Sequence, residues 1–401
     1  MHRYIETLEK PKILKPLLKK NLVTNIPAKN IDQKWMRYAL SEARKAVGRS
    51  AENPPVGCVI VAASGELVGV GHTARTGRPH AETVALAIAG AQARDATAYV
   101  TLEPCAHHGQ TPPCAAALIE SGIRRVVIAQ QDPDRRVNGQ GVAMLQAAGI
   151  EVATDIASEM AFSVMQGFLH RIEHKRPLVT IKTATSLDGG IALGDGRKIW
   201  LTSPPMRRYV HLLRSKSDAI LTGIGTVLAD DPEMTCRLPG LEQDSPLRFV
   251  LDSQLRCPPD AKILRNNDGA PTVIFCADTA SSEAREALEK AGADIVPVAV
   301  VSSQDDGTHK RLDLSEILHY LGNAGVNNLL VEAGSAIVTS VIAADAADFI
   351  HWTQSQHLLG SDAIPAISPL KLVALPEQTR YTETHHQQIG RDRLTILAKS
   401  L

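Results

Sequence analysis

One histidine, one glutamate and two cysteines in the first third of the chain have the types and spacing of a catalytic metal site. They lie in His80-Ala81-Glu82, in Pro104-Cys105 and in Pro112-Pro113-Cys114. One imidazole and two thiolates give zinc three protein ligands and leave the fourth tetrahedral position to water, as in catalytic zinc sites. Glu82 would stand over that water and shuttle protons. The pattern predicts one zinc ion per chain on His80, Cys105 and Cys114, with Glu82 as the catalytic acid/base.

Zinc deaminases carry His-x-Glu followed by Pro-Cys-x-x-Cys, but here eight residues separate Cys105 from Cys114. Two other interpretations remain open. The three residues could be a core histidine and two unrelated buried cysteines. They could also form a structural zinc site, with His107 or His108 as the fourth ligand. The catalytic interpretation is favoured because His-x-Glu, a strand before Pro104 and a Pro-Pro-Cys helix start agree.

The elements that must position these ligands alternate between strand and helix. Buried strands are expected at 56–61, 98–102, 125–129 and 150–153, and helices at 35–47, 80–91, 114–120 and 141–148. Two of these helices begin beside a ligand, and helix N-termini favour anions, so Cys114 should ionise easily. The alternation predicts an α/β sandwich with parallel strands.

A polar, basic and proline-terminated stretch, His170–Pro177, separates this series from a second one. We therefore expect a first domain over 31–173 and a second over 174–401. Residues 1–30 are rich in lysine and punctuated by proline, and we expect a mobile, dispensable extension. Strands are predicted at 178–184, 218–222, 247–252, 272–277, 294–299, 328–332 and 347–353, and helices at 204–214, 281–291, 314–323 and 335–344. Ser203-Pro204 supplies an N-cap and a first-turn proline.

Ligands of the second domain are expected beyond the C-terminal ends of its strands, as in other open parallel sheets. Gly223-Ile224-Gly225 is too short for a Rossmann fingerprint. Asp252-Ser253 and Glu332-Ala333-Gly334-Ser335 follow two other strands, and the helix that begins at Gly334-Ser335 could hold a phosphate. Arg214 and Arg237 could clamp a substrate phosphate, because planar guanidinium groups match its oxygens. The alternative is that both are solvated surface arginines.

Composition argues against several classes of protein. The 401 residues include 43 basic and 43 acidic side chains, so the formal net charge is zero, and aromatic residues are 3%. A sequence-independent nucleic-acid binder would show a basic excess and aromatic stacking platforms. No apolar run approaches the ~20 residues of a membrane span. Six cysteines are too few for a disulfide scaffold, and the N-terminus has no apolar signal core, so we expect a cytoplasmic protein.

The stretch Thr101-Leu102-Glu103-Pro104-Cys105-Ala106-His107-His108-Gly109-Gln110-Thr111-Pro112-Pro113-Cys114 resembles the signature of the bifunctional riboflavin-biosynthesis deaminase/reductases. The longer gap between the cysteines is typical of that family. The resemblance covers about residues 33–400. It includes Asn53-Pro54-Pro55-Val56-Gly57-Cys58, Pro79-His80-Ala81-Glu82, Ser186-Leu187-Asp188-Gly189, Trp200-Leu201-Thr202-Ser203, Ala229-Asp230-Asp231-Pro232 and Val331-Glu332-Ala333-Gly334.

The resemblance implies a cytidine-deaminase-like α/β/α sandwich followed by a dihydrofolate-reductase-like α/β domain. The first would use zinc to deaminate a 2,5-diamino-6-ribosylamino-pyrimidinone 5'-phosphate, and the second would use NADPH to reduce the ribosyl side chain to ribityl. Implied deaminase substrate contacts are Asn53 and Asp132. Implied reductase substrate contacts are Lys182, Lys198, Arg214, Asp230, Met234, Arg237 and Glu332, and implied cofactor contacts are Ala184, Trp200, Thr226, Ser253, Gly334 and Ser335.

The same resemblance implies a homo-oligomer that acts on a small molecule and binds neither nucleic acid nor membrane. The chain departs from the family pattern at Thr73, Ala106 and Asp134, and in Gly196-Arg197-Lys198-Ile199-Trp200. Two other functions are kept as alternatives. One is a nucleic-acid or nucleoside base deaminase with a non-catalytic C-terminal binding domain. The other is a zinc-dependent structural or interaction protein whose second domain is inactive.

Overall fold

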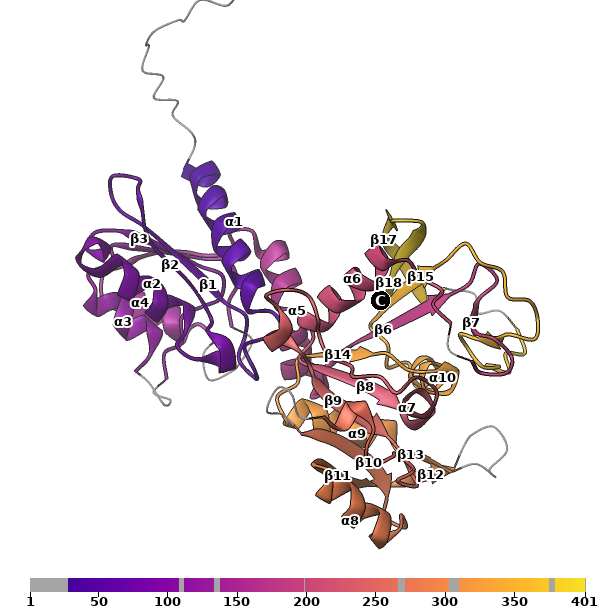
Figure 1. Ribbon diagram of the computed structural model, residues 1–401. Coiled ribbons are helices and arrows are strands. Elements are labelled where there is room, and N and C mark those ends of the chain that lie inside the picture. The colour runs from indigo at the N-terminus through magenta and orange to yellow at the C-terminus, as the bar shows by residue number, and fades with distance from the viewer. Residues whose placement is uncertain are drawn as a thin grey trace, which may run out of the picture.

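The structure is a computed structural model and describes residues 28–107, 112–132, 138–197, 199–265, 271–302, 310–374 and 379–400. Figure 1 shows two α/β units joined where α5 (Ser158–His174) leads into β6 (Leu178–Thr185). The stretch expected to be a polar connection is therefore mostly the end of a helix, and only residues 175–177 join it to the next strand. Helix α1 begins at Ala28, inside the last three residues of the expected extension, and the residues before it lie outside the described residues.

The first unit is built on a five-stranded sheet in the order β2-β1-β3-β4-β5. Its strands are β1 (Gly57–Val61), β2 (Leu67–His72), β3 (Thr97–Val100), β4 (Arg125–Ile128) and β5 (Glu151–Ala153). Strands β3, β4 and β5 run parallel, but β1 pairs antiparallel with β2 and β3. The expectation of parallel strands throughout is wrong at this edge. The reason is an unpredicted strand, β2, which a short loop joins to β1, and such a loop can connect only antiparallel neighbours.

Five helices cover the two faces of this sheet: α1 (Ala28–Ala46), α2 (Ala81–Ala89), α3 (Cys114–Glu120), α4 (Gln140–Ala147) and α5. A Cβ at Gly57 would stand 1.9 Å from the carbonyl oxygen of Ala39 in α1, and one at Gly71 would stand 2.3 Å from that of Ala81 in α2. Gly57 pairs with His72, so Gly71 faces the other side of the pleat. Helices α1 and α2 therefore cover opposite faces, with α5 beside α1 and α3 beside α2 (Figure 1).

The second unit contains a nine-stranded sheet in the order β11-β10-β9-β8-β14-β6-β15-β18-β17. The seven strands from β11 to β15 in that order run parallel, and β18 pairs antiparallel with its two neighbours. Besides β6, these strands are β8 (Ala219–Gly223), β9 (Leu247–Leu251), β10 (Thr272–Ala277), β11 (Ala293–Val298), β14 (Asn328–Val331), β15 (Phe349–Gln354), β17 (Tyr381–Ile389) and β18 (Asp392–Lys399).

Helices and small ribbons complete the second unit. The helices are α6 (Pro204–Ser215), α7 (Ile224–Asp230), α8 (Ser282–Lys290), α9 (Leu314–Asn323) and α10 (Ser335–Ala343), and the ribbons pair β7 (Gly190–Ala192) with β16 (Ile364–Pro365) and β12 (Val300–Ser302) with β13 (Lys310–Leu312). Every strand and helix predicted for this half is present to within two residues. Helix α6 begins after Ser203 as expected, but the Ser203 hydroxyl donates to Asp392 and does not cap the helix.

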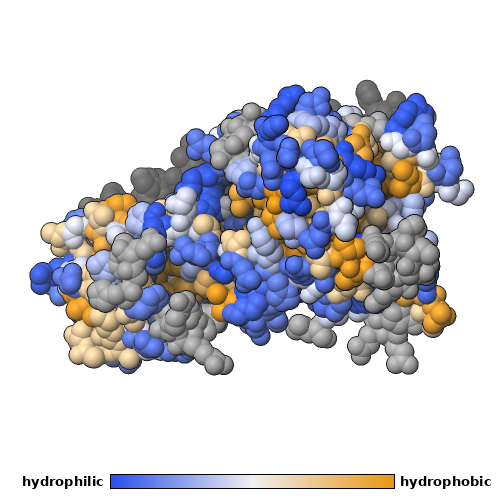
Figure 2. All heavy atoms as spheres, turned by 90° about the horizontal axis from the view of Figure 1, so that it is seen from below, coloured by the Kyte–Doolittle hydropathy of each residue, from blue (hydrophilic) through white to orange (hydrophobic). Residues whose placement is uncertain are grey.

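Separate apolar cores lie in the two units, and inner strands such as β8 are buried on both faces, whereas the outer strands β5 and β11 are partly exposed. Over the described residues, no helix is both long and apolar enough to cross a membrane. On the face shown in Figure 2, apolar residues are scattered among hydrophilic ones over both units. The functional residues must therefore be sought at loops and helix ends rather than in one exposed apolar patch.

Candidate active sites

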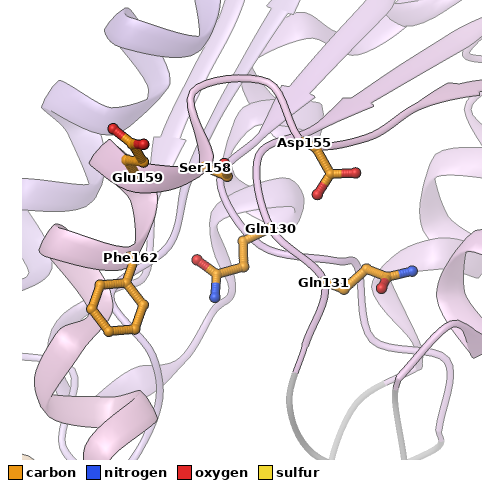
Figure 3. A pocket seen from close by; sticks show the side chains of 6 residues that line it. All are labelled: Gln130, Gln131, Asp155, Ser158, Glu159 and Phe162. Carbon is orange, nitrogen blue, oxygen red and sulfur yellow. The ribbon is translucent and has the colours of Figure 1, made fainter.

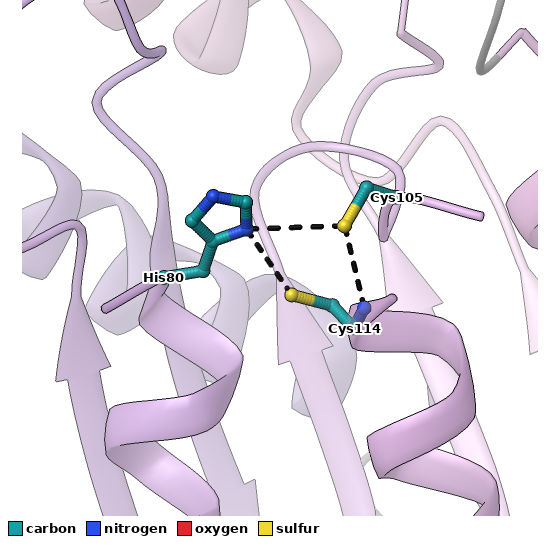
Figure 4. Close-up of side chains that lie close together, drawn as sticks. All are labelled: His80, Cys105 and Cys114. Atoms are coloured by element: carbon teal, nitrogen blue, oxygen red, sulfur yellow. Dashed lines mark hydrogen bonds between the residues drawn. The ribbon is translucent and has the colours of Figure 1, made fainter. Parts of the chain in front are cut away.

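His80, Cys105 and Cys114 come together in the first unit, and their ligand atoms all lie within 4.8 Å of one another. His80 Nδ1 is 3.2 Å from the Cys114 sulfur and 3.8 Å from the Cys105 sulfur. Figure 4 shows the ring nitrogen facing both sulfurs. A tetrahedral zinc ion with ordinary bond lengths separates a nitrogen ligand from a sulfur ligand by about 3.5 Å. The three side chains therefore fit zinc as they stand.

Helix starts position two of these ligands. His80 is the N-cap of α2, and Cys114 is the first residue of α3. The Cys114 backbone N–H donates to the Cys105 sulfur at 3.3 Å, which ties the loop after β3 to the start of α3. Both helix N-termini place partial positive charge beside the sulfurs, where it favours the thiolate that binds metal.

The charges of the cluster favour one thiolate and one buried carboxyl group. A hydrogen bond from Cys114 lowers the pKa of the Cys105 thiol to about 4, against the effect of burial. That shared proton, together with burial, raises the pKa of Cys114, so the expectation that Cys114 ionises easily is wrong for this arrangement of the two thiols. Glu82 lies in the first turn of α2 and is 4% exposed. Burial, and then the negative charge of Cys105, raise the pKa of Glu82 to about 7. The site thus pairs three ligands with a buried acid.

Asn53 lies in the loop before β1 and packs against the loop that leads to His80. A Cβ at Gly77 would stand only 2.0 Å from the Asn53 amide nitrogen. Thr73 fixes the loop that contains Asn53, because its hydroxyl donates to the Pro54 carbonyl and accepts from the Val56 N–H, each at 2.9 Å. This departure from the family pattern therefore has a packing role here.

Asp132 follows β4 and is 8% exposed. Its backbone N–H donates to Glu103 at 3.4 Å, and Glu103 also accepts from the N–H groups of Gly139 and Val142 at 3.0 and 3.1 Å. Glu103 precedes Pro104-Cys105, so one buried carboxylate joins the metal loop to the loop of Asp132. No role for Glu103 was predicted, although an acidic residue next to a ligand motif is a sequence signal for one. Asp134 and His108 lie outside the described residues.

A cavity of about 480 Å³ adjoins the Asp132 loop. Figure 3 shows its lining side chains, which come from the loop after β4, the loop after β5 and the start of α5: Gln130, Gln131, Asp155, Ser158, Glu159 and Phe162. None of the zinc-cluster residues lines it. We therefore place the chemistry at His80, Cys105 and Cys114 and not in this cavity.

In the second unit, Glu332 gathers several of the expected substrate residues. Arg214 donates to both of its carboxylate oxygens, at 2.7 and 3.0 Å, and Lys182 Nζ lies 3.9 Å from one of them. Arg214 also donates to the carbonyl of Thr235 and lies 3.8 Å from the Met234 sulfur. Burial alone would raise the pKa of Glu332, but the charges of Arg214 and Lys182 outweigh it and lower that pKa.

Lys182 and Asp230 belong to the same charged group. Burial lowers the pKa of Lys182, and the charges of Glu332 and Asp230 oppose that effect. Arg237 is different, because it is exposed and pairs with Glu233, four residues before it, at 3.0 Å. Arg214 thus pairs with a buried carboxylate, whereas Arg237 lies at the surface. The two arginines are therefore not both free to bind one substrate phosphate, as the sequence analysis expected. Lys198 lies outside the described residues.

Most of the expected cofactor residues lie at or after the C-terminal ends of neighbouring strands in the nine-stranded sheet. Strands β9, β8, β14 and β6 are parallel neighbours, so their C-terminal ends meet at that edge. Ser253 follows β9, Thr226 lies in α7 after β8, and Gly334 and Ser335 begin α10 after β14; Ala184 is near the end of β6. A Cβ at Gly334 would stand 3.9 Å from the Thr226 hydroxyl. The register therefore brings these four strand ends together.

Trp200 lies before α6 and is 66% exposed. The guanidinium of Arg207, in α6, lies 4.7 Å from the centre of its ring. Ser335, the first residue of α10, has its hydroxyl 2.8 Å from that of Ser368. An exposed indole held by a cation can stack on a planar ring of a ligand.

Family models match both units. Residues 29–130 match the model described as the cytidine and deoxycytidylate deaminase zinc-binding region. Residues 177–395 match the RibD C-terminal domain model. The two matches divide the chain as the structure does, with α5 between them.

Curated relatives match nearly the whole chain. It is 39% identical to the riboflavin biosynthesis protein RibD of Escherichia coli over 369 residues, which cover 88% of this chain and 96% of that protein. It is 36% identical to the riboflavin biosynthesis protein RibD of Aquifex aeolicus over 364 residues, 91% of this chain and 97% of that one.

Solved structures agree with both units at once. Acinetobacter baumannii RibD superposes with a TM-score of 0.82 at 33% identity, and 93% of this chain covers all of that one. The diaminohydroxyphosphoribosylaminopyrimidine deaminase/5-amino-6-(5-phosphoribosylamino)uracil reductase of Thermotoga maritima gives 0.80 at 30% identity, with the same coverage. The expected fold, a cytidine-deaminase-like sandwich followed by a dihydrofolate-reductase-like domain, is confirmed.

Proposed function

The chain belongs to the RibD family of bifunctional deaminase/reductases of riboflavin biosynthesis, and from this premise we propose the substrates, cofactors and residues of its two reactions. The first domain, 31–173, deaminates 2,5-diamino-6-ribosylamino-pyrimidinone 5'-phosphate. The second, 174–401, reduces the ribosyl side chain of the product to ribityl with NADPH. The observation that carries the proposal is the convergence of His80, Cys105 and Cys114 beside buried Glu82.

In the deaminase, His80, Cys105 and Cys114 hold the zinc ion. Zinc, when bound, would supply a water of lowered pKa as the nucleophile. Glu82 is not a ligand; from the first turn of α2 it accepts the proton of that water on its carboxylate and returns it to the leaving amino group. Buried surroundings keep this proton on Glu82 between the two transfers, because they stabilise the neutral acid.

The substrate ring is held by the two loops that flank the zinc cluster. Asn53 offers an amide that can donate and accept, and Asp132 offers a carboxylate, which together match the alternating donors and acceptors of a diaminopyrimidinone edge. Glu103 fixes the Asp132 loop through the three backbone hydrogen bonds described above. Asn53 is fixed by its contact with Gly77.

In the reductase, Lys182, Arg214, Asp230, Met234 and Glu332 form the substrate side of the site. Lys182 approaches the reacting carbon, while Asp230 and Glu332 bind the hydroxyl and pyrimidine groups. NADPH supplies a hydride when bound. Its expected contacts are Ala184, Trp200, Thr226, Ser253, Gly334 and Ser335, with the N-terminus of α10 facing a phosphate. Arg237, at the surface, and Lys198, which lies outside the described residues, complete the expected substrate set.

The remaining expectations stay predictions. They are a cytoplasmic location, a small-molecule substrate without nucleic acid, and a homo-oligomer, which sedimentation velocity checks. A base deaminase with a non-catalytic C-terminal domain is not favoured, because residues 177–395 match the RibD C-terminal domain.

The proposal is tested with purified protein, the diaminopyrimidinone ribosyl phosphate and NADPH. We expect ammonia release together with loss of the reduced nicotinamide absorbance. Glu82→Gln should keep its zinc and lose ammonia release by about 10²–10⁴-fold, because a positioned acid/base contributes that much. The same variant should still oxidise NADPH when it is given the deaminated substrate.

Glu120→Gln is the matched control, because that glutamate is exposed at the end of α3. It should leave both reactions unchanged. Ammonia release without NADPH use by the unaltered protein would contradict the reductase half of the proposal. Full zinc content in a folded Cys105→Ala variant would contradict the ligand set.

A further inference from the structure

An ion-pair cluster joins the two domains at the loop that precedes Asn53. Arg49 and Arg75, both from the first domain, pair with the single carboxylate of Asp244, which belongs to the short helix Glu242–Asp244 of the second domain. Asp244 is only 4% exposed. Arg75 also donates to the Gln243 carbonyl at 2.8 Å. One buried carboxylate therefore holds two cations from two separate loops of the other domain.

Asn327, just before β14, makes a second set of contacts with the loop that precedes Asn53. Its side-chain amide donates to the Ala51 carbonyl at 2.8 Å and accepts from Arg171 of α5 at 2.7 Å. Arg171 in turn donates to the Glu52 carbonyl at 2.6 Å. Asn327 is 2% exposed, and its backbone N–H donates to buried Asp218 at 3.1 Å. The two residues directly before Asn53 are thus bonded to the second domain or to the helix that leads into it.

Asn53 lies where the loop of Arg49 and the loop of Arg75 meet. The Thr76 N–H donates to the Arg49 carbonyl at 2.9 Å, so the loop of Arg75 and the loop of Arg49 move together. The Ser50 hydroxyl donates to the Asn53 carbonyl at 2.8 Å, and Gly77 packs on the Asn53 amide. Three residues after Gly77, His80 begins the metal site. A displacement of either loop would therefore reach Asn53 directly.

Charge explains why the first domain cannot hold this arrangement alone. The Arg49 and Arg75 guanidinium groups converge on one point, and like charges at such distances repel. Asp244 supplies the counter-charge, in a position shielded from water, where it is screened little by salt. Without it, the lowest-energy arrangement of the two arginines is to separate into solvent, because 26% of one side chain and 48% of the other are already exposed.

We propose that Asp244 and Asn327 of the reductase domain are positioning residues for the deaminase: they hold the 49–53 and 75–77 loops so that Asn53 meets the substrate. This inference rests on the proposed function, in which Asn53 contacts the diaminopyrimidinone. The reductase domain thereby has a second role, because it completes the substrate site of its neighbour. Neither residue touches zinc or Glu82 in this role, so the chemistry itself stays with the first domain.

The test is the Asp244→Asn variant of the full-length, zinc-loaded protein. The amide keeps the shape and loses the charge, so the loops spend less time in the binding arrangement. If about one-tenth of the molecules stay competent, the KM of ammonia release rises about tenfold. The kcat should change less than threefold, since zinc and Glu82 are untouched. The KM and kcat of NADPH oxidation with the deaminated substrate should stay as in the unaltered protein.

Glu242→Gln is the matched control, because it removes an exposed carboxylate from the same short helix. It should change neither reaction. Arg75→Gln keeps the proposal testable if Asp244→Asn folds poorly, because it removes one partner from a half-exposed position. It should raise the same KM, and combining it with Asp244→Asn should add little further effect, because both act on one cluster.

An unchanged KM of ammonia release in folded Asp244→Asn and Arg75→Gln would overturn the proposal. So would an equal loss in both reactions, which would mark a general effect on folding. Failure of the unaltered protein to release ammonia from the substrate would instead contradict the proposed function. These outcomes are distinguishable because the unaltered protein, the two variants and the control are measured on both reactions.

Discussion

The Glu332 carboxylate is the counter-charge for two cationic side chains, Arg214 and Lys182. It receives two hydrogen bonds from Arg214 and lies near Lys182, and all three are buried. A guanidinium group removed from water needs such a partner, because an unpaired buried charge is far costlier than an exposed one. Arg237, by contrast, pairs with Glu233 at the surface.

These two pairs predict opposite effects on stability. Glu332→Ala should lower the free energy of unfolding by about 3–5 kcal/mol, because it leaves Arg214 buried without its partner. Glu233→Ala should lower it by about 0–1 kcal/mol, because exposed pairs contribute little. Urea unfolding followed by circular dichroism measures both. Equal effects of the two changes would show that the Arg214 pair is not buried as described.

The convergence of His80, Cys105 and Cys114 could be predicted from the sequence, because each lies in a local motif. Two of them lie at helix starts that a nearby proline and the spacing indicate. It could not predict Glu103 as the organiser of the Asp132 loop, because its three partners lie 29 to 39 residues away. Nor could it show that Arg214 pairs with Glu332, 118 residues distant, instead of opening toward solvent. Long-range pairing of charges leaves no periodic signal in a single sequence.

Close packing of α2 on β2 is the element-level feature on which the metal site depends. Gly71 allows the backbone of α2 to approach, since a Cβ there would lie 2.3 Å from Ala81 and 2.7 Å from the N–H of Ala85. Backbone atoms cannot give way as a flexible side chain can. The N-terminus of this helix carries His80 and Glu82, so its position sets theirs.

Gly71→Ala should therefore push α2 outward. We expect a fall in melting temperature of several degrees, corresponding to about 1–3 kcal/mol of overpacking, and weaker zinc retention against a chelator. Gly225→Ala in α7 is the control for stability, because an added methyl group there meets nothing within 4 Å. Zinc retention equal to that of the unaltered protein would contradict this coupling between helix position and metal site.

Strand β15 carries a partly buried histidine, His351, whose protonation should oppose folding. Burial lowers the pKa of His351 to about 4, and its Nδ1 lies 2.7 Å from the Tyr209 hydroxyl. An unfolded chain takes up a proton at this residue near pH 6.5, whereas the folded one does so only near pH 4. The contribution of His351 to stability is thus present above pH 6.5 and is lost as the pH falls toward 4.

His351→Gln should remove this dependence. Between pH 6.5 and 4, the slope of unfolding free energy against pH should fall by up to about 1.4 kcal/mol per pH unit. His385→Gln, on exposed β17, is the control and should leave the slope unchanged. Chemical denaturation at a series of pH values gives both slopes, and identical slopes for the two variants would reject the assignment.

Periodicity predicted most of the elements that are buried on one or both faces, although it missed α5 and β2, which are also partly buried. Strands β6, β8 and β10 read as apolar runs, and α8 and α9 begin at Ser281 and Asp313, whose side chains cap them. The hairpin of β17 and β18 escaped prediction, because seven successive residues of β17 are exposed and mostly polar. Helix α5 was missed because its charged last turn resembles a connection.

At the scale of the whole molecule, two reactions lie in two domains that share a chain. Glu82 and Asp230 belong to different domains, and neither reaction needs the other's residue. Mixing Glu82→Gln with Asp230→Asn protein should therefore restore formation of the deaminated, reduced product that each variant alone fails to make. Chromatography of the products after equal times checks this. A mixture as inactive as its components would mean that the intermediate does not pass through solution.

The order of synthesis gives the contacts of Asn327 a further consequence. This residue is made 276 positions after Ala51, whose carbonyl it binds. At roughly 5–20 residues per second, the ribosome needs about 14–55 s to cover that distance. The first domain leaves the ribosome during this time and can fold around its metal before Asn327 has been made. A chain released by premature termination ahead of Asn327 should hold zinc and yet bind its substrate weakly, so the first domain becomes fully competent only after synthesis has passed Asn327 and this contact has formed.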